Sequence, residues 1–189
     1  MATDRQRVVL ATGNAEKREE WRALLADSPY ALVMYDGPSP VEDAPDYEGN
    51  AAIKAVAAMR ATGLPALGDD TGIEIEALHG GPGLFSKQYA EERGGWPEAR
   101  RDVARTALGS RARFVTGLAW AEPDGTVITV RGESTGRIVA PVDPGVGLEP
   151  TFAPDGFDRS IAGLTGEDRA RVHYRVRAWA ALREKLTGA

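Results

Sequence analysis

The sequence predicts an α/β protein, because short apolar runs that end in polar turns alternate with helical patterns along the first half of the chain. Further on, two apolar segments flank Glu122–Gly125, a sequence typical of a hairpin turn, which predicts an antiparallel section of sheet. Of the 189 residues, 42% are hydrophobic, enough for a packed interior. We therefore expect one domain over residues 1–189, or two small lobes that share a core.

The first element is an apolar run at Arg7–Thr12, after which Trp21 and two leucines recur at helical spacing. This pattern predicts a strand, a polar turn and a helix. Backbone N–H groups at the start of such a helix lack partners and favour anions, so Thr12, Asn14 and Lys17 are candidate phosphate contacts. An ordinary turn capped by Asn14 is the alternative.

Leu32–Tyr35 predicts a second strand, and the acidic stretch Glu42–Glu48 follows it after a Pro- and Gly-rich break. An acidic loop of this kind is most often a solvated connection. A helix is expected from about Asn50 to Arg60, with Lys54 away from a buried stripe formed by Ile53, Val56 and Met59.

Leu64–Gly68 predicts a third strand that delivers Asp69 and Asp70 at its C-terminal end, where α/β sheets bind ligands. We interpret Gly68–Gly72 as an exposed turn, because Ile73–Ala77 alternates like a separate, half-buried strand. Adjacent carboxylates in a turn suit a divalent cation and a general base, and they cannot both ionise freely without a cation. A plain turn is the alternative.

In the second half, Trp96–Leu108 predicts a helix, and Gly166–Leu186 predicts an Arg-rich helix or a pair of helices. Gly132–Gly136 matches the G-x-S-x-G elbow of serine hydrolases, but Arg137–Pro141 reads as extended rather than helical. We therefore interpret Gly132–Gly136 as a turn between strands. A P-loop motif does not occur in the sequence, which disfavours a P-loop kinase or GTPase.

Composition narrows the classes of function. The net charge of −5 argues against a broad nucleic-acid-binding surface but leaves room for a small anionic ligand. The chain has no cysteine, which excludes disulfides and thiolate metal sites and fits a reducing cytoplasm. The N-terminus lacks a signal-peptide core and no apolar run is long enough to span a bilayer, so we expect a cytoplasmic protein without a membrane partner.

Four segments together resemble the family of inosine and xanthosine triphosphate pyrophosphatases, also described as Ham1-like. In chain order they are Ala11–Lys17, Asn50–Ala55, Gly68–Gly72 and Gly80–Ser86, with partial matches continuing to the C-terminal helix. The resemblance implies an elongated mixed sheet flanked by helices, with two lobes and a nucleotide cleft between them, usually as a homodimer. It also implies Mg²⁺-dependent cleavage between the α and β phosphates of deaminated purine nucleoside triphosphates, which gives a nucleoside monophosphate and pyrophosphate.

The resemblance assigns a role to individual residues. Asp70 falls on the metal-linked catalytic base, Glu42 falls on a metal-binding glutamate, and Asp69 would support both. Lysines, Mg²⁺ and carboxylates are a sufficient set for phosphoanhydride hydrolysis, which needs a placed water and neutralised phosphate charge rather than a covalent nucleophile. The implied phosphate contacts are Thr12, Asn14, Lys17 (also counted as catalytic) and Lys54, with Thr71 beside the aspartates.

The base-recognition half departs from the family pattern. The family's Gly-Phe-Gly-Tyr-Asp-Pro appears here as Gly145–Pro150, which loses both aromatic side chains and lengthens the acid. The family's lysine and Ser-His-Arg align, without gaps, with Arg169 and with His173-Tyr174-Arg175, so Tyr174 takes the position of a base-contacting histidine. A one-residue shift would instead give that role to His173. The implied base contacts are Val146, Gly147, Leu148, Glu149, Arg169, Tyr174 and Arg175.

Three hypotheses follow for function. The first is hydrolysis of deaminated purine triphosphates such as ITP, dITP and XTP. The second is a pathway-specialised nucleotide hydrolase with altered base specificity, because contacts in the base pocket set discrimination. The third is a nucleotide-binding protein without turnover, against which the presence of Glu42, Lys54, Asp69 and Asp70 argues.

Overall fold

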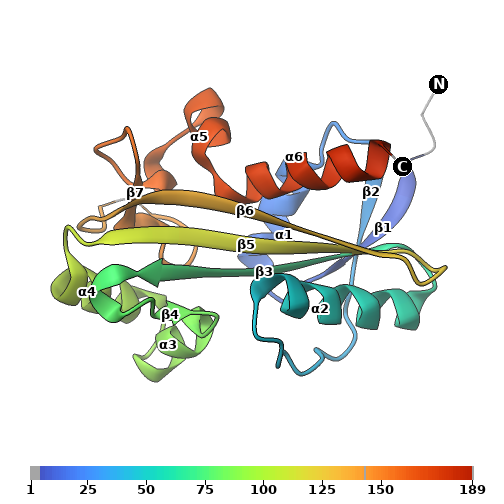
Figure 1. Cartoon of the computed structure of the whole chain (residues 1–189), viewed down its shortest axis with the longest axis horizontal. Coiled ribbons are helices and arrows are strands. Elements are labelled where there is room, and N and C mark those ends of the chain that lie inside the picture. Colours follow the sequence, from blue (N-terminus) through green and yellow to red (C-terminus); the bar gives the residue numbers. More distant parts are fainter. Residues whose placement is uncertain (1–4, 143, 189) are drawn as a thin grey trace. The chain divides into compact units, whose positions relative to one another are not determined.

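The computed structural model describes residues 5–142 and 144–188. The chain divides into two compact units, whose elements are labelled in Figure 1. The first unit comprises Met1–Asp70, Gly117–Arg131 and Ala180–Ala189, and the second comprises Thr71–Thr116 and Gly132–Trp179. Every helix within the described ranges is too short or too polar to cross a membrane. One domain over residues 1–189 stays a prediction.

Among the described residues, seven strands pair into one sheet in the order β2-β1-β3-β5-β6-β7, and β4 pairs with β3 off this path. β1 is parallel to β2 and to β3, whereas β4 is antiparallel to β3 and β7 is antiparallel to β6. The predicted α/β class with a mixed sheet is confirmed. The strands are β1 (Gln6–Ala11), β2 (Tyr30–Met34), β3 (Ala66–Ile75), β4 (Pro82–Gly83), β5 (Arg111–Ala121), β6 (Val127–Ile138) and β7 (Phe152–Pro154).

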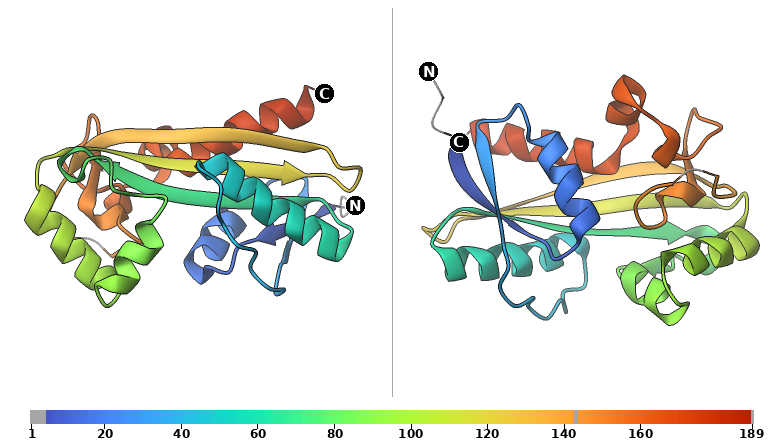
Figure 2. Two further views of the ribbon diagram at one scale, coloured as in Figure 1. Left: turned by 60° about the horizontal axis from the view of Figure 1, so that its bottom comes forward. Right: turned by 180° about the vertical axis from the view of Figure 1, so that it is seen from behind.

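The helices account for the remaining regular structure. The one predicted from Trp96 is present, and the C-terminal segment forms a pair of helices. In the views of Figures 1 and 2, α3 and α4 lie side by side, and Arg93 of the turn after α3 joins Asp102 of α4 by an ion pair. The α-helices are α1 (Ala15–Leu24), α2 (Tyr47–Thr62), α3 (Ser86–Glu92), α4 (Trp96–Ala107), α5 (Gly166–Val172) and α6 (Tyr174–Thr187), and 3₁₀ helices span Glu76–Leu78, Glu149–Thr151 and Ile161–Gly163.

Helix α2 of the first unit begins three residues before the predicted start. Asp46 caps it, because its carboxylate accepts a hydrogen bond from the Gly49 amide at 2.7 Å. The predicted stripe is wrong for two of its members: Ile53 and Val56 are only partly buried. The buried face instead carries small residues, chiefly Ala51, Ala55 and Ala58, together with Met59.

Close approach between backbones explains this choice of small residues. A Cβ placed on Gly68 of β3 would lie 2.0 Å from the Ala51 carbonyl oxygen, and one on Gly117 of β5 would lie 2.5 Å from the Glu48 amide nitrogen. Helix α2 therefore packs directly on the backbones of β3 and β5, which leaves no room for branched side chains between them.

The predicted turn at Gly68–Gly72 is also wrong. These residues continue a single strand, β3, from Ala66 to Ile75. Gly68 allows the close contact with α2 and does not form a turn. A glycine beside two aspartates is therefore not evidence for a turn here. Because neighbouring side chains of a strand point to opposite faces of the sheet, Asp69 and Asp70 face opposite sides of β3.

Strand β6 overturns the second predicted turn in the same way. Gly132–Gly136 lies inside β6, whose Ser134 is buried. A Cβ on Gly132 would lie 2.1 Å from the Tyr174 carbonyl oxygen, and one on Gly136 would lie 2.1 Å from that of Ala153. These glycines admit neighbouring backbone, and a serine-hydrolase elbow, which requires a strand-to-helix turn, is excluded at this position.

Each unit has a core of its own. In the first unit, alanines of α2 pack with Val9 of β1 and with Ala119 of β5. In the second unit, aromatic and aliphatic side chains from α4, β5, β7 and α5 surround Phe114, whose ring stacks on Tyr174 with centroids 4.7 Å apart. The second core includes Leu148 and Tyr174, two residues that the sequence assigned to ligand contact.

Candidate active site

Asp69 faces helix α1 in the first unit. Its Oδ1 forms an ion pair with Lys17 Nζ, and its Oδ2 accepts a hydrogen bond from Trp21 Nε1 at 3.1 Å. Lys17 and Trp21 are one helical turn apart, so one face of α1 supplies both partners. The Asp69 side chain has no exposed surface, and it holds the Lys17 ammonium in place.

Asp70 points to the other face of β3, toward helix α2. Its Oδ1 accepts from Lys54 Nζ at 3.1 Å, and its Oδ2 accepts from Asn50 Nδ2 at 3.3 Å. Asn50 and Lys54 are again one turn apart on their helix. Unlike Asp69, the Asp70 side chain keeps 14% of its surface exposed, so it is the aspartate that can reach a ligand.

Lys54 joins Asp70 to the acidic loop. The same Nζ donates to Glu42 Oε2 at 2.6 Å, so the loop carboxylate and the strand carboxylate meet at one ammonium. Burial alone would lower the pKa of Lys54, but the charges of Asp70 and Glu42 outweigh it and the pKa is raised. We call Lys17, Glu42, Lys54, Asp69 and Asp70 the acid–lysine cluster.

Glu42 and Asp70 fit a hard divalent cation. Both offer carboxylate oxygens, the donors that Mg²⁺ prefers, and both already converge on one positive group, the Lys54 ammonium. Both side chains also retain exposed surface, 37% for Glu42 and 14% for Asp70. Asp69 does not fit, because its side chain has no exposed surface through which a cation could reach it.

The turn before α1 is ordered by its own polar side chains. Asn14 caps the helix by accepting from the Lys17 amide at 3.1 Å, and Thr12 Oγ1 accepts from the Asn14 amide at 3.3 Å. Arg18 donates to the carbonyls of Thr12 and Tyr35, which fixes the turn from the outside. A Cβ on Gly13 would meet nothing within 4 Å, so the turn leaves open space beside it.

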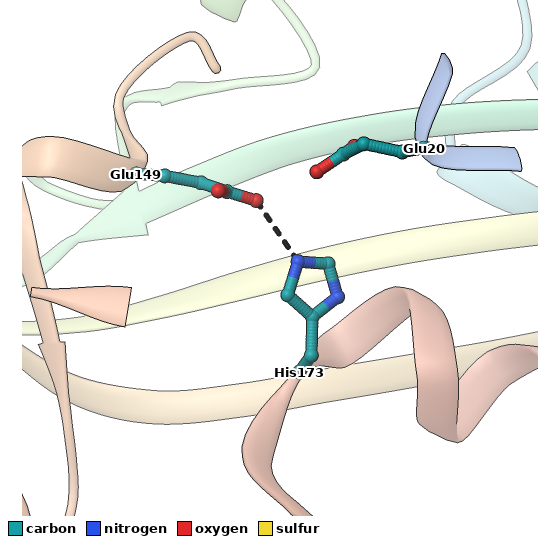
Figure 3. A group of neighbouring side chains, drawn as sticks. All are labelled: Glu20, Glu149 and His173. Atoms are coloured by element: carbon teal, nitrogen blue, oxygen red, sulfur yellow. Dashed lines mark hydrogen bonds and ion pairs between the residues drawn. The ribbon is translucent and has the colours of Figure 1, made fainter. Parts of the chain in front are cut away.

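The second unit holds a different polar group, built around the carboxylate of Glu149. Oε1 accepts from the Tyr174 hydroxyl at 2.6 Å and from His173 Nε2 at 3.0 Å, the contact drawn in Figure 3. Oε2 accepts from Arg169 Nη2 at 3.2 Å. Glu149 and Tyr174 are each only 2% exposed. We call Glu149, Arg169, His173 and Tyr174 the Glu149 cluster.

Hydrogen bonding fixes the proton of His173. The Arg175 backbone amide donates to Nδ1 at 3.2 Å, which assigns the ring proton to Nε2 and makes Nε2 the donor to Glu149 Oε1. Arg169 Nη2 also lies 2.9 Å from Nε2, but in this tautomer both nitrogens carry protons, so that contact is not a hydrogen bond. Burial lowers the pKa of His173, and the charges of Arg169 and Arg175 lower it further against the pull of Glu149. The imidazole is therefore neutral at neutral pH.

Glu149 keeps its charge despite its burial. Burial alone would raise the pKa of Glu149, but the hydrogen bond from His173, the charge of Arg169 and the hydrogen bond from Tyr174 outweigh it and lower the pKa. A buried, ionised carboxylate with three donors is a fixed acceptor whose direction does not fluctuate.

The remaining predicted base contacts have varied surroundings. Leu148 and Arg175 are buried at 2% exposure, and Val146 accepts the Glu149 amide hydrogen bond at 3.0 Å through its carbonyl. The Gly147 carbonyl accepts from Arg100 at 2.7 Å. Thr71 shares a 2.6 Å hydroxyl contact with Thr116 across β3 and β5.

The predicted site residues thus fall into two groups. The first unit holds Lys17 with Asp69 on one face of β3, Glu42 and Lys54 with Asp70 on the other face, and Thr12 and Asn14 at the start of α1. The second unit holds Thr71, residues 146–149, Arg169, Tyr174 and Arg175. Sequence reasoning missed Trp21, the side-chain role of Asn50, Arg100, and His173 as a donor to Glu149. The spacing of four residues from Lys17 and from Lys54 was the available signal for the first two.

Comparison with known proteins covers nearly the whole chain. The model of the Ham1 family matches residues 8–185. The chain is 41% identical over 186 residues to a dITP/XTP pyrophosphatase of Deinococcus deserti, covering 94% of this chain and 88% of the relative, and 42% identical over 185 residues to one of Leifsonia xyli, covering 93% of each. A HAM1 protein structure from Coxiella burnetii is similar with a TM-score of 0.81 and 30% identity, covering 97% of this chain and 100% of that one.

Proposed function

Since this chain belongs to the Ham1 family, we propose that it is a nucleoside triphosphate pyrophosphohydrolase acting on deaminated purine nucleotides such as dITP, ITP and XTP. It would cleave between the α and β phosphates and release a nucleoside monophosphate and pyrophosphate. The observation that carries the proposal is the meeting of Glu42 and Asp70 at the Lys54 ammonium, with Asn50 donating to Asp70, on the side of β3 that faces α2.

The acid–lysine cluster supports a division of labour in hydrolysis. Asp70 accepts the proton of the attacking water, because its carboxylate is the less buried of the two aspartates and is held in place by Asn50 and Lys54. The new P–O bond forms as the bridging α–β anhydride bond breaks, and the leaving pyrophosphate carries the negative charge. Lys17, oriented by Asp69, and Lys54 offset that charge.

We propose Mg²⁺ as the cofactor, held by Glu42 and Asp70. When bound, it neutralises phosphate charge and lowers the pKa of water. Its binding would compete with the Lys54 contacts to the same two carboxylates, which frees the ammonium to reach a phosphate. Thr12 and Asn14 at the start of α1 are the proposed phosphate contacts, supported by the open space at Gly13.

The Glu149 cluster is proposed to set the preference among bases, together with residues 146–148. An ionised acceptor suits a ring N–H such as N1–H of a 6-oxopurine, and adenine has no proton at that position. A second candidate is a hydrolase with altered base specificity. It is favoured because Glu149 Oε1 already accepts hydrogen bonds from Tyr174 and His173 of the same chain. A homodimer and a cytoplasmic location are proposed on the family resemblance and, for the location, on the absence of cysteine.

Pyrophosphate release tests the proposal directly. The purified chain is assayed with and without Mg²⁺ against inosine, xanthosine, deoxyinosine, adenosine, guanosine, cytidine and uridine triphosphates. Preference for the deaminated purines, abolished by a chelator, is the expected result. Preference for another base would favour the altered-specificity candidate, and turnover of none, with nucleotide still bound, would favour a binding protein.

A further inference from the structure

Arg100 of the second unit belongs to neither cluster, and it hydrogen-bonds to the loop that precedes Glu149. Arg100 of α4 donates through Nε to the Gly147 carbonyl at 2.7 Å and through Nη2 to the Gly145 carbonyl at 2.5 Å. A guanidinium presents these N–H groups in a fixed plane, so two carbonyls two residues apart must turn toward one point.

The backbone of the loop is curled to match. Gly147 has φ of +52°, a conformation that side-chain-bearing residues rarely adopt, and the Glu149 amide donates back to the Val146 carbonyl at 3.0 Å. That hydrogen bond lies at the start of the 3₁₀ helix Glu149–Thr151. The backbone conformation that Arg100 stabilises therefore sets the direction in which the Glu149 side chain projects.

A second side chain of α4 supports the loop. Trp96 lies one helical turn before Arg100, and a Cβ placed on Gly147 would lie 3.7 Å from the Trp96 ring, at ordinary contact distance. On the inner side, Leu148 is buried in the core of the second unit. The loop therefore lies between Trp96 and Arg100 of α4 on one side and the buried Leu148 on the other. Glu149 follows this loop directly in the sequence.

We propose that Arg100 is a positioning residue for base recognition, which fixes the turn at Gly145–Gly147 and thereby the aim of the Glu149 carboxylate. The inference rests on the proposed function of the Glu149 cluster. Arg100 touches no reacting atom in this role, so its loss acts on selectivity and on KM rather than on the phosphate chemistry of the acid–lysine cluster.

The substitution Arg100→Lys tests this, with Arg101→Ala as the matched control. Lysine keeps the charge but offers a point donor that cannot hold two carbonyls in one plane. Arg101 is the next residue of the same helix, is largely exposed, and pairs with Glu98 on the surface. We expect Arg100→Lys to reduce the ratio of kcat/KM between the best and the worst nucleotide by about tenfold, mainly through KM, while Arg101→Ala leaves it unchanged.

Hydrogen exchange supplies a readout that needs no turnover. The Glu149 amide, bonded to Val146, should exchange faster in Arg100→Lys than in the wild type and Arg101→Ala proteins. An unchanged selectivity ratio, or unchanged exchange at Glu149, would overturn the inference while the wild-type activity leaves the proposed function standing. Absence of turnover in the wild-type chain would overturn the proposed function, and this inference with it.

Discussion

The acid–lysine cluster and the Glu149 cluster both surround carboxylates with hydrogen-bond donors, yet the donors and the exposure of the carboxylates differ. In the first, Asp70 and Glu42 face a lysine and keep exposed surface, and in the second Glu149 is buried with a phenol, a neutral imidazole and a guanidinium. A lysine on a flexible stem can yield its place to a metal ion or move to a phosphate. Donors on buried rings cannot leave, so the second cluster is suited to discrimination by fixed shape.

The same contrast divides the two adjacent aspartates. Asp69 is enclosed like Glu149, with no exposed side-chain surface, whereas the Asp70 side chain keeps 14% of its surface exposed. Adjacency in sequence therefore does not mean a shared task. An enclosed carboxylate of this kind contributes to stability and to the positioning of its partner, whereas an exposed one is accessible for chemistry.

Asp70→Asn is the sharpest test, with the largest expected effect. We expect kcat to fall by roughly 10²–10⁴-fold, because the amide cannot take a proton from water and is a poorer metal donor. The free energy of unfolding should change by less than about 1 kcal/mol, since Asn fills the same volume and Lys54 keeps Glu42 as its charged partner. Steady-state pyrophosphate release and urea unfolding measure the two quantities. Near-normal kcat would show that Asp70 is not the base.

Asp69→Asn is the matched variant one residue away. It removes the buried charge that faces the Lys17 ammonium, which is only 15% exposed, so we expect the free energy of unfolding to fall by about 3 kcal/mol. Urea unfolding of the two variants side by side gives the comparison directly. Equal stability losses in Asp69→Asn and Asp70→Asn would break the distinction between an enclosed and an open aspartate.

Glu149→Gln extends the test to the second unit, where the expected loss of stability at pH 7 is about 2 kcal/mol. The folded-state pKa of Glu149 is lowered from an ordinary value of 4.5, so its charge stabilises the fold above that pH and the contribution is lost as pH falls below it. The difference between wild type and Glu149→Gln should therefore shrink from pH 5 to pH 3 in urea titrations.

His173 must be separated from that effect. Its pKa is lowered from 6.5, so the unfolded chain binds an extra proton as pH falls below about 6.5 and stability declines there too. Glu149→Gln also removes the pull of Glu149 on the pKa of His173, so the contribution of His173 is measured between pH 7 and pH 5 and that of Glu149 between pH 5 and pH 3. A difference that stays constant from pH 7 to pH 3 would contradict an ionised, hydrogen-bonded Glu149.

Much of the first unit could be predicted because its residues lie in short continuous patterns. The strand and helix around Asn14 follow from local spacing, whereas a shared site for Lys54, Glu42 and Asp70 was implied by the family resemblance. The glycines misled the prediction, because Gly68 and Gly132 admit a distant backbone and not a turn. No local pattern announces such a contact. The branched stripe on α2 failed for the same reason.

The Glu149 cluster was less accessible to sequence reasoning. The family resemblance implied that Glu149, Arg169 and Tyr174 are separate contacts to a base. The structure instead places all three in one hydrogen-bonded group with His173. The three partners of Glu149 lie 20 to 25 residues after it in the chain. Their roles as ligands of a nucleotide stay predictions.

Tyr174→Phe carries the smallest expected effect and decides how the Glu149 cluster works. The ring still stacks on Phe114 and on His173, so only the hydroxyl is lost and stability should fall by about 1 kcal/mol. If Tyr174 acts by aiming Glu149, this single hydrogen bond also shifts kcat/KM ratios across the nucleotide panel. Tyr174→His, which restores the histidine of the family pattern, should shift the same ratios further, because it replaces both the phenol and its stacking. Unchanged ratios in both variants would place Tyr174 outside base recognition and leave the enclosed cluster a purely structural one.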